Sequence, residues 1–86
     1  MLAGFETESE VHTDKGRIDV VLKKDKTVEI VEIKYSKDNK LEEKLKEALR
    51  QIRDTKYYEK YSNRNPTLLG VVFGENKDIA SKFENI

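Results

Sequence analysis

A change in the spacing of apolar residues near position 36 constrains the fold most. Up to Tyr35, apolar and polar residues alternate in three segments, which span 5–11, 17–22 and 28–35. Alternation places successive side chains on opposite faces, as in a half-buried strand. From Leu41 to Ile52 the apolar residues instead recur every three or four positions, which is typical of an amphipathic helix. The chain should therefore have an α/β fold.

The connections between these segments predict how the strands pair. The links at residues 14–16 and 24–26 are short, so the first three strands should form an antiparallel meander. The helix should break near residues 54–57 and continue as a short helical segment. Thr67–Phe73 reads as a fourth strand, parallel to the third because a helix connects them, so the sheet should be mixed. The tail from Glu75 to Ile86 is predicted to be a short amphipathic helix.

Composition restricts the class of protein. The 86 residues fit a single domain, 1–86, and the absence of cysteine excludes a disulfide scaffold and a thiolate zinc site. No apolar run approaches the roughly 18 residues of a membrane span, and a cytoplasmic location is expected. Residues 1–14 carry four acids and no base, whereas the remainder holds seventeen basic and thirteen acidic residues. This distribution fits a metal site beside a phosphate-binding surface, or alternatively an ordinary solvated surface.

Charged residues interrupt two of the predicted strands. Glu32 and Lys34 follow Val28 and Ile30 on one face of the third strand, and Asp19 interrupts the second. If these strands form a hairpin, Asp19 lies opposite or diagonal to Glu32. Two carboxylates beside a lysine suit Mg²⁺ or Mn²⁺, which prefer oxygen ligands. The alternative is a set of cross-strand salt bridges on a solvated face.

The helix and the segment after it add further candidates. Gln51 lies just off the apolar stripe, from which it could reach a site at the strand ends; the alternative is a boundary residue without a role. Tyr57, Tyr58 and Tyr61 could stack on DNA bases, but packing of the helix end against the sheet is favoured.

Taken in order, several segments between Phe5 and Phe73 resemble the PD-(D/E)XK nuclease superfamily. The resemblance is strongest to the branch that forms the C-terminal domain of AAA-ATPase-like prokaryotic proteins. It rests on Gly16–Leu22, Val31–Lys34, Ala48–Ile52, Lys56–Tyr61 and Leu69–Phe73.

The resemblance implies a restriction-endonuclease-like fold with a mixed four-stranded sheet and a β-β-β-α-β core. It implies that Asp19, Glu32 and the main-chain carbonyl of Ile33 bind Mg²⁺, for which Mn²⁺ can substitute. Lys34 would be the catalytic lysine and Gln51 an auxiliary residue. The implied activity is metal-dependent hydrolysis of DNA phosphodiester bonds, with an endonuclease favoured over an exonuclease.

One departure from the superfamily pattern affects these expectations. The family normally begins with a helix that packs on the sheet and often supplies another acid, but this chain starts about where that helix ends. The domain is therefore expected to be a truncated or minimal version, with Glu8 or Glu10 as the candidate replacement acid. A homodimer is expected to supply the missing layer, and an AAA-ATPase-like domain could lie in a longer parent protein. The alternative function is a catalytically silent nuclease-fold module for interaction or dimerisation, in which Asp19, Glu32 and Lys34 form salt bridges.

Overall fold

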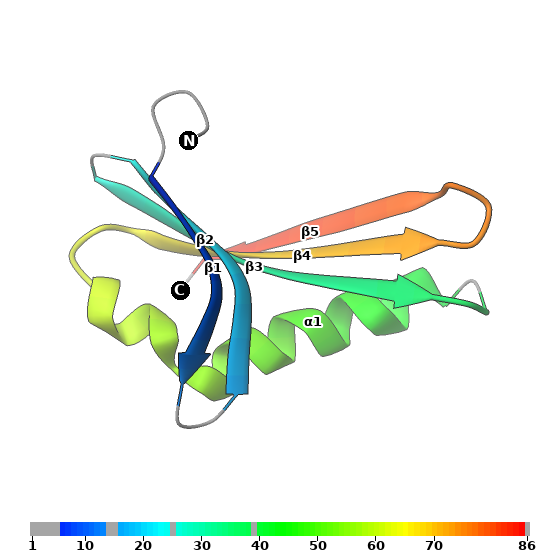
Figure 1. The fold of residues 1–86 in the computed structure, drawn as a ribbon, viewed down its shortest axis with the longest axis horizontal. Coiled ribbons are helices and arrows are strands. Elements are labelled where there is room, and N and C mark those ends of the chain that lie inside the picture. The colour runs from blue at the N-terminus through cyan, green and yellow to red at the C-terminus, as the bar shows by residue number, and fades with distance from the viewer. Residues whose placement is uncertain (1–5, 14–15, 25, 39, 86) are drawn as a thin grey trace.

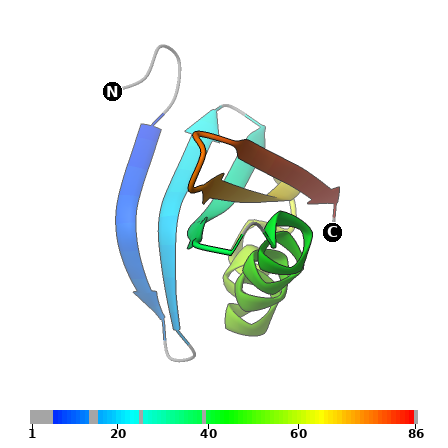
Figure 2. The ribbon, with the colours of Figure 1, turned by 90° about the vertical axis from the view of Figure 1, so that its right-hand side faces the viewer.

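A five-stranded sheet curls around one long helix (Figures 1 and 2). The computed structural model describes residues 6–13, 16–24, 26–38 and 40–85, so Phe5 and Ile86, where two predicted elements begin and end, lie outside the described residues. The elements are β1 (Glu6–Thr13), β2 (Gly16–Lys24), β3 (Thr27–Ser36), α1 (Leu41–Thr55), the 3₁₀ helix η1 (Tyr57–Tyr61), β4 (Pro66–Gly74) and β5 (Ile79–Asn85).

The sheet is mixed, as the sequence predicted. Its strands lie in chain order, and β1, β2 and β3 form an antiparallel meander. The crossover through α1 makes β3 and β4 parallel, with Val28 level with Pro66 and Ser36 level with Gly74. The predicted α/β class is therefore confirmed.

Helix α1 packs on the sheet through the apolar stripe that the sequence predicted. Leu45, Ala48, Leu49 and Ile52 are all buried. The predicted break is also present, because Lys56 adopts a left-handed conformation (φ 55°) and its N–H donates to the carbonyl of Arg53. The core beneath the helix includes Ile18, Val21, Val28, Ile30, Leu68 and Val72. No helix in the described part of the chain has the length and apolar character needed to cross a membrane.

The prediction of a helix in the tail was wrong, because residues 79–85 form β5. The Gly74 N–H donates to the carbonyl of Asp78 at 2.8 Å and closes the turn after β4. Strand β5 then pairs with the edge of β4 from Phe73↔Ile79 to Thr67↔Asn85. An isolated helix of this length is marginal in water, whereas the edge of β4 offers ready backbone partners. The sheet consequently has five strands rather than four.

Tyrosines join η1 to the first two strands. Tyr61 is buried, and its ring meets that of Tyr57 edge to face with centroids 5.6 Å apart. The Tyr57 hydroxyl also lies 3.3 Å from a carboxylate oxygen of Glu8 on β1. Tyr58 is half-buried against the same core. These contacts support the packing interpretation of the tyrosines.

Only one face of the sheet is covered by α1 (Figure 2). Strand register places the largest exposed apolar side chains together on the opposite face, because Tyr35 is level with Phe73 and Phe73 with Ile79. We call this surface the open face; its exposed apolar residues are Ile33, Tyr35, Phe73, Ile79 and Phe83.

Candidate active site

Strands β2 and β3 separate at Asp19, which creates the site. Their backbone pairing runs from Lys24↔Thr27 to Val20↔Val31. At the next position, the Ile33 N–H donates to Asp19 Oδ2 at 2.8 Å. The Asp19 side chain thus accepts the hydrogen bond that a backbone carbonyl of β2 would otherwise accept from β3. The part of β2 that precedes Asp19 bends away from β3, whereas β3 continues beside β4 (Figure 1).

This register places the Asp19 and Glu32 side chains together, and a hydrogen bond joins them. Glu32 is only 7% exposed. Burial raises the pKa of Glu32 to about 8, and the hydrogen bond and charge of Asp19 act in the same direction. Glu32 therefore holds a proton at neutral pH.

Asp19 is ionised under the same conditions. Partial burial tends to raise the pKa of Asp19, but the hydrogen bonds from Glu32 and the Ile33 amide outweigh it and hold that pKa below its usual value. Arg17 adds to this effect, since its Nη2 lies 3.1 Å from Asp19 Oδ1. The pair thus carries one negative charge and one proton.

A divalent cation fits this donor set. Two adjacent carboxyl groups that compete for one proton provide hard oxygen ligands, and a cation would displace that proton. Among the residues that the structure describes, no group of three or more His, Cys, Asp or Glu side chains is placed to hold a metal ion. Two carboxylates completed by a main-chain oxygen and waters suit Mg²⁺ or Mn²⁺, which keep several waters when protein-bound.

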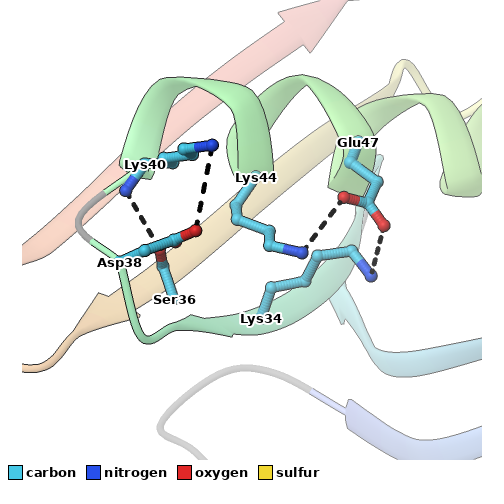
Figure 3. A network of polar contacts seen from close by, with 6 residues as sticks. All are labelled: Lys34, Ser36, Asp38, Lys40, Lys44 and Glu47. Carbon is cyan, nitrogen blue, oxygen red and sulfur yellow. Dashed lines mark hydrogen bonds and ion pairs between the residues drawn. The ribbon is translucent and has the colours of Figure 1, made fainter.

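Lys34 lies on the same face of β3 as Glu32, next to helix α1. Its ammonium is close enough for its charge to favour the ionised forms of Asp19 and Glu32. Lys34 Nζ also lies 3.8 Å from Glu47 Oε1 on α1 (Figure 3). A carboxyl pair with a cationic neighbour is a suitable arrangement for binding both a metal ion and a phosphate.

Comparison with known families decides the classification. A family model described as the PD-(D/E)XK nuclease superfamily matches residues 1–83. The chain belongs to the PD-(D/E)XK nuclease superfamily. A search among curated proteins finds no significant match.

Members of the PD-(D/E)XK superfamily are generally nucleases and typically use divalent metal ions. Asp19 and the Glu32-Ile33-Lys34 segment match the D and the (D/E)XK of the superfamily name, with Ile18 where the name has proline, and the structure brings these residues together across β2 and β3. The fold agrees, since an α/β structure with a mixed sheet is consistent with a restriction-endonuclease-like member.

Gln51 of this PD-(D/E)XK domain lies on α1, one turn after Glu47. It is exposed on α1 and lines a hollow of about 250 Å³ together with Arg17 and the end of the helix. Within the described part of the chain, no hydrogen bond joins Gln51 to Asp19, Glu32 or Lys34. Arg17, which lines the same hollow as Gln51, ion-pairs with Asp19.

The two candidates for an additional acid differ in their surroundings. Glu8 contacts the Lys23 ammonium and the Tyr57 hydroxyl, which also lower the pKa of Glu8. Glu10 is exposed, has a left-handed conformation (φ 50°), and lies between residues that pair with Val20 and Ile18. It is thus level with Asp19, so Glu10 is the acid whose role as a ligand deserves testing.

Glu47 is the residue of this site that sequence reasoning missed. Its position in the helical repeat indicates the outer, solvated face of α1, yet it lies half-buried against Lys34. Little in the sequence indicates this contact. It is made by two long side chains that reach across from the flank of α1 to β3, so neither residue has to lie at a buried position of its own element.

Proposed function

We propose that this domain is a Mg²⁺-dependent deoxyribonuclease that cleaves DNA as an endonuclease. The observation that carries the proposal is the carboxyl pair of buried Glu32 and partly buried Asp19, which lie together where β2 leaves β3. Burying such a pair without a cation is costly, so its presence beside a lysine favours a functional role over a structural one. Membership of a nuclease superfamily supports the same conclusion.

The carboxylates of Asp19 and Glu32 and the main-chain carbonyl of Ile33 would hold the ion, and Mn²⁺ should substitute. When bound, the ion supplies a Lewis acid for the scissile phosphate and a bound water of lowered pKa. The Ile33 N–H and Arg17 fix the orientation of the Asp19 carboxylate. Lys34 would donate hydrogen bonds to the phosphate and offset the negative charge that develops during hydrolysis.

A cleavage assay tests this function. Circular duplex, linear duplex, single-stranded and branched DNA are incubated with the protein in Mg²⁺, Mn²⁺ or EDTA. The wild type should cut with either metal and not in EDTA, and cutting of circular DNA identifies an endonuclease. Glu32→Gln should abolish cleavage. Glu29→Gln should not abolish cleavage, because Glu29 lies on the opposite face of β3 from Glu32 and is level with Leu22. Cleavage by Glu32→Gln at the wild-type rate would contradict the proposal.

A catalytically silent interaction module is the second candidate. It is favoured by the ion pairs that Asp19 and Lys34 already make, with Arg17 and Glu47 respectively. In a silent module these pairs are the final arrangement, so metal titration should show no saturable site and no DNA should be cut.

We further propose that two copies associate through the open face. Its three aromatic side chains are roughly half-exposed, and each has about 150–250 Å² of surface. With the two isoleucines, the patch reaches the few hundred Å² that monomers rarely leave uncovered. These five residues carry no charge, so a contact made through them brings no like charges together. An association with an AAA-ATPase-like domain and a cytoplasmic location stay predictions of the sequence.

A further inference from the structure

Lys34 is held by a residue of the helix rather than by the carboxyl pair. Figure 3 shows the Glu47 carboxylate between two lysines, with Lys34 Nζ at 3.8 Å from Oε1 and Lys44 Nζ at 3.4 Å from Oε2. Lys44 is three residues before Glu47 on α1, so that contact stays within the helix. The contact with Lys34 instead links α1 to β3.

The partners of the carboxyl pair explain this arrangement. Asp19 accepts from the Ile33 N–H and pairs with Arg17, and Glu32 shares a hydrogen bond with Asp19. Among the described residues, Glu47 is the carboxylate within ion-pair distance of Lys34. Because lysine has a long and flexible side chain, its ammonium needs such a partner to stay in one position.

We infer that Glu47 is a positioning residue that holds the Lys34 ammonium beside the Asp19–Glu32 pair. It acts through Lys34 and has no direct contact with DNA or metal in this role. Lys44 contacts the other oxygen of the Glu47 carboxylate. This second contact restricts the movement of the carboxylate, and therefore the movement of the Lys34 ammonium bound to it. This inference rests on the proposed nuclease function, because it assigns a role within the same site.

Kinetics of Glu47→Gln test the role in an active protein. Small displacements of a catalytic group have large effects on rate, so kcat should fall about tenfold. KM for DNA and the Mg²⁺ concentration for half-maximal activity should stay unchanged, because Glu47 binds neither. Glu43→Gln, an exposed acid one turn earlier on α1, is the matched control and should leave kcat unchanged.

A double-mutant cycle separates positioning from a general effect on the fold. In a Lys34→Ala background, Glu47→Gln should cause no further loss of kcat, because the group that it positions is absent. An additional tenfold loss in that background would show that Glu47 acts independently of Lys34 and would overturn the inference.

The lysine itself provides a readout that does not depend on cleavage. Lysines are labelled by reductive ¹³C-methylation, and the Lys34 signal is assigned from Lys34→Arg in the metal-free protein. Glu47→Gln should shift that signal, and Glu43→Gln should not. If the Lys34 signal does not shift in Glu47→Gln, the role of Glu47 is wrong. If the wild type cuts DNA and Glu47→Gln has the same kcat, the role of Glu47 is also wrong, but the nuclease proposal stands. A wild type that cuts no DNA would overturn the nuclease proposal and the role of Glu47 with it.

Discussion

Asp19 on β2 and Glu32 on β3 are joined by a hydrogen bond between their side chains at the point where the two strands separate. The Ile33 N–H holds Asp19 in place, and burial keeps Glu32 protonated near neutral pH. A divalent cation could replace the shared proton, so the stability of the domain, its response to pH and its metal binding should be linked.

The metal-free protein should lose stability as the pH rises from about 4.5 to about 8. Glu32 titrates near pH 4.5 when unfolded but has a pKa of about 8 when folded. The folded state therefore binds more protons in this window, and the free energy of unfolding should fall by on the order of 3 kcal/mol. Urea denaturation in EDTA at constant ionic strength measures this slope. If the free energy of unfolding stays constant or rises with pH, and does so equally in the wild type and in Glu32→Gln, Glu32 does not hold a proton in the folded state.

Glu32→Gln should stabilise the metal-free protein above pH 8 while destroying the metal site. The amide is neutral at every pH and can still donate a hydrogen bond to Asp19, so the cost of ionising a buried group is removed. The gain should be about 1–3 kcal/mol at pH 9. Added Mg²⁺ should raise the melting temperature of the wild type and leave that of the variant unchanged. Thermal denaturation with and without Mg²⁺ measures both the gain in stability of Glu32→Gln and the loss of its response to the metal. A variant that is still stabilised by Mg²⁺ would contradict the assignment of Glu32 as a ligand.

Gly70→Ala should loosen the packing of α1 over the site. Gly70 is level with Glu32, and a Cβ at this position would lie 3.3 Å from Ala48 Cβ and 3.5 Å from the Leu45 carbonyl oxygen. Because backbone and a Cβ cannot move aside easily, the cost should be about 1–3 kcal/mol.

The comparison is Gly74→Ala, where the added Cβ would lie 3.3 Å from the flexible end of Leu41 and 3.4 Å from the Cβ of Asp78, which is exposed in the turn after β4 rather than packed in the core. Chemical denaturation of the two variants should rank Gly70→Ala as the more destabilised. Equal stability of the two variants would contradict the close packing of α1 on β4 at Gly70.

Phe83→Lys should abolish self-association through the open face. Phe83 is 60% exposed and lies level with Leu69 on that face. A lysine there would place like charges opposite each other in a symmetric pair. Light scattering should give twice the chain mass for the wild type and for Lys82→Gln, a neighbouring control, and a single chain mass for Phe83→Lys. A monomeric wild type would exclude the dimer without affecting the site.

The pairing of Asp19 with Glu32 was predictable because the hairpin leaves few options. A short turn fixes the register of β2 and β3, and a shift by one residue would expose the buried side chains of both strands. The parallel arrangement of β3 and β4 was predictable for a similar reason, since a crossover helix permits little else.

Features that depend on distant partners were not predictable in the same way. The spacing of Ile79 and Phe83 fits a helix as well as a strand, and the free edge of β4 decided the outcome. The contact between Glu47 and Lys34 depends on how α1 lies across β3, which no local pattern determines.

Isothermal titration calorimetry with Mn²⁺ is the most direct test of the shared metal site. Wild type, Asp19→Asn, Glu32→Gln and the control Glu29→Gln are titrated at pH 7.5. We expect one saturable site per chain in the wild type and in Glu29→Gln, and no saturable site in Asp19→Asn or Glu32→Gln. Absence of a saturable site in the wild type, or undiminished binding by either site variant, would contradict the claim that Asp19 and Glu32 hold one ion together.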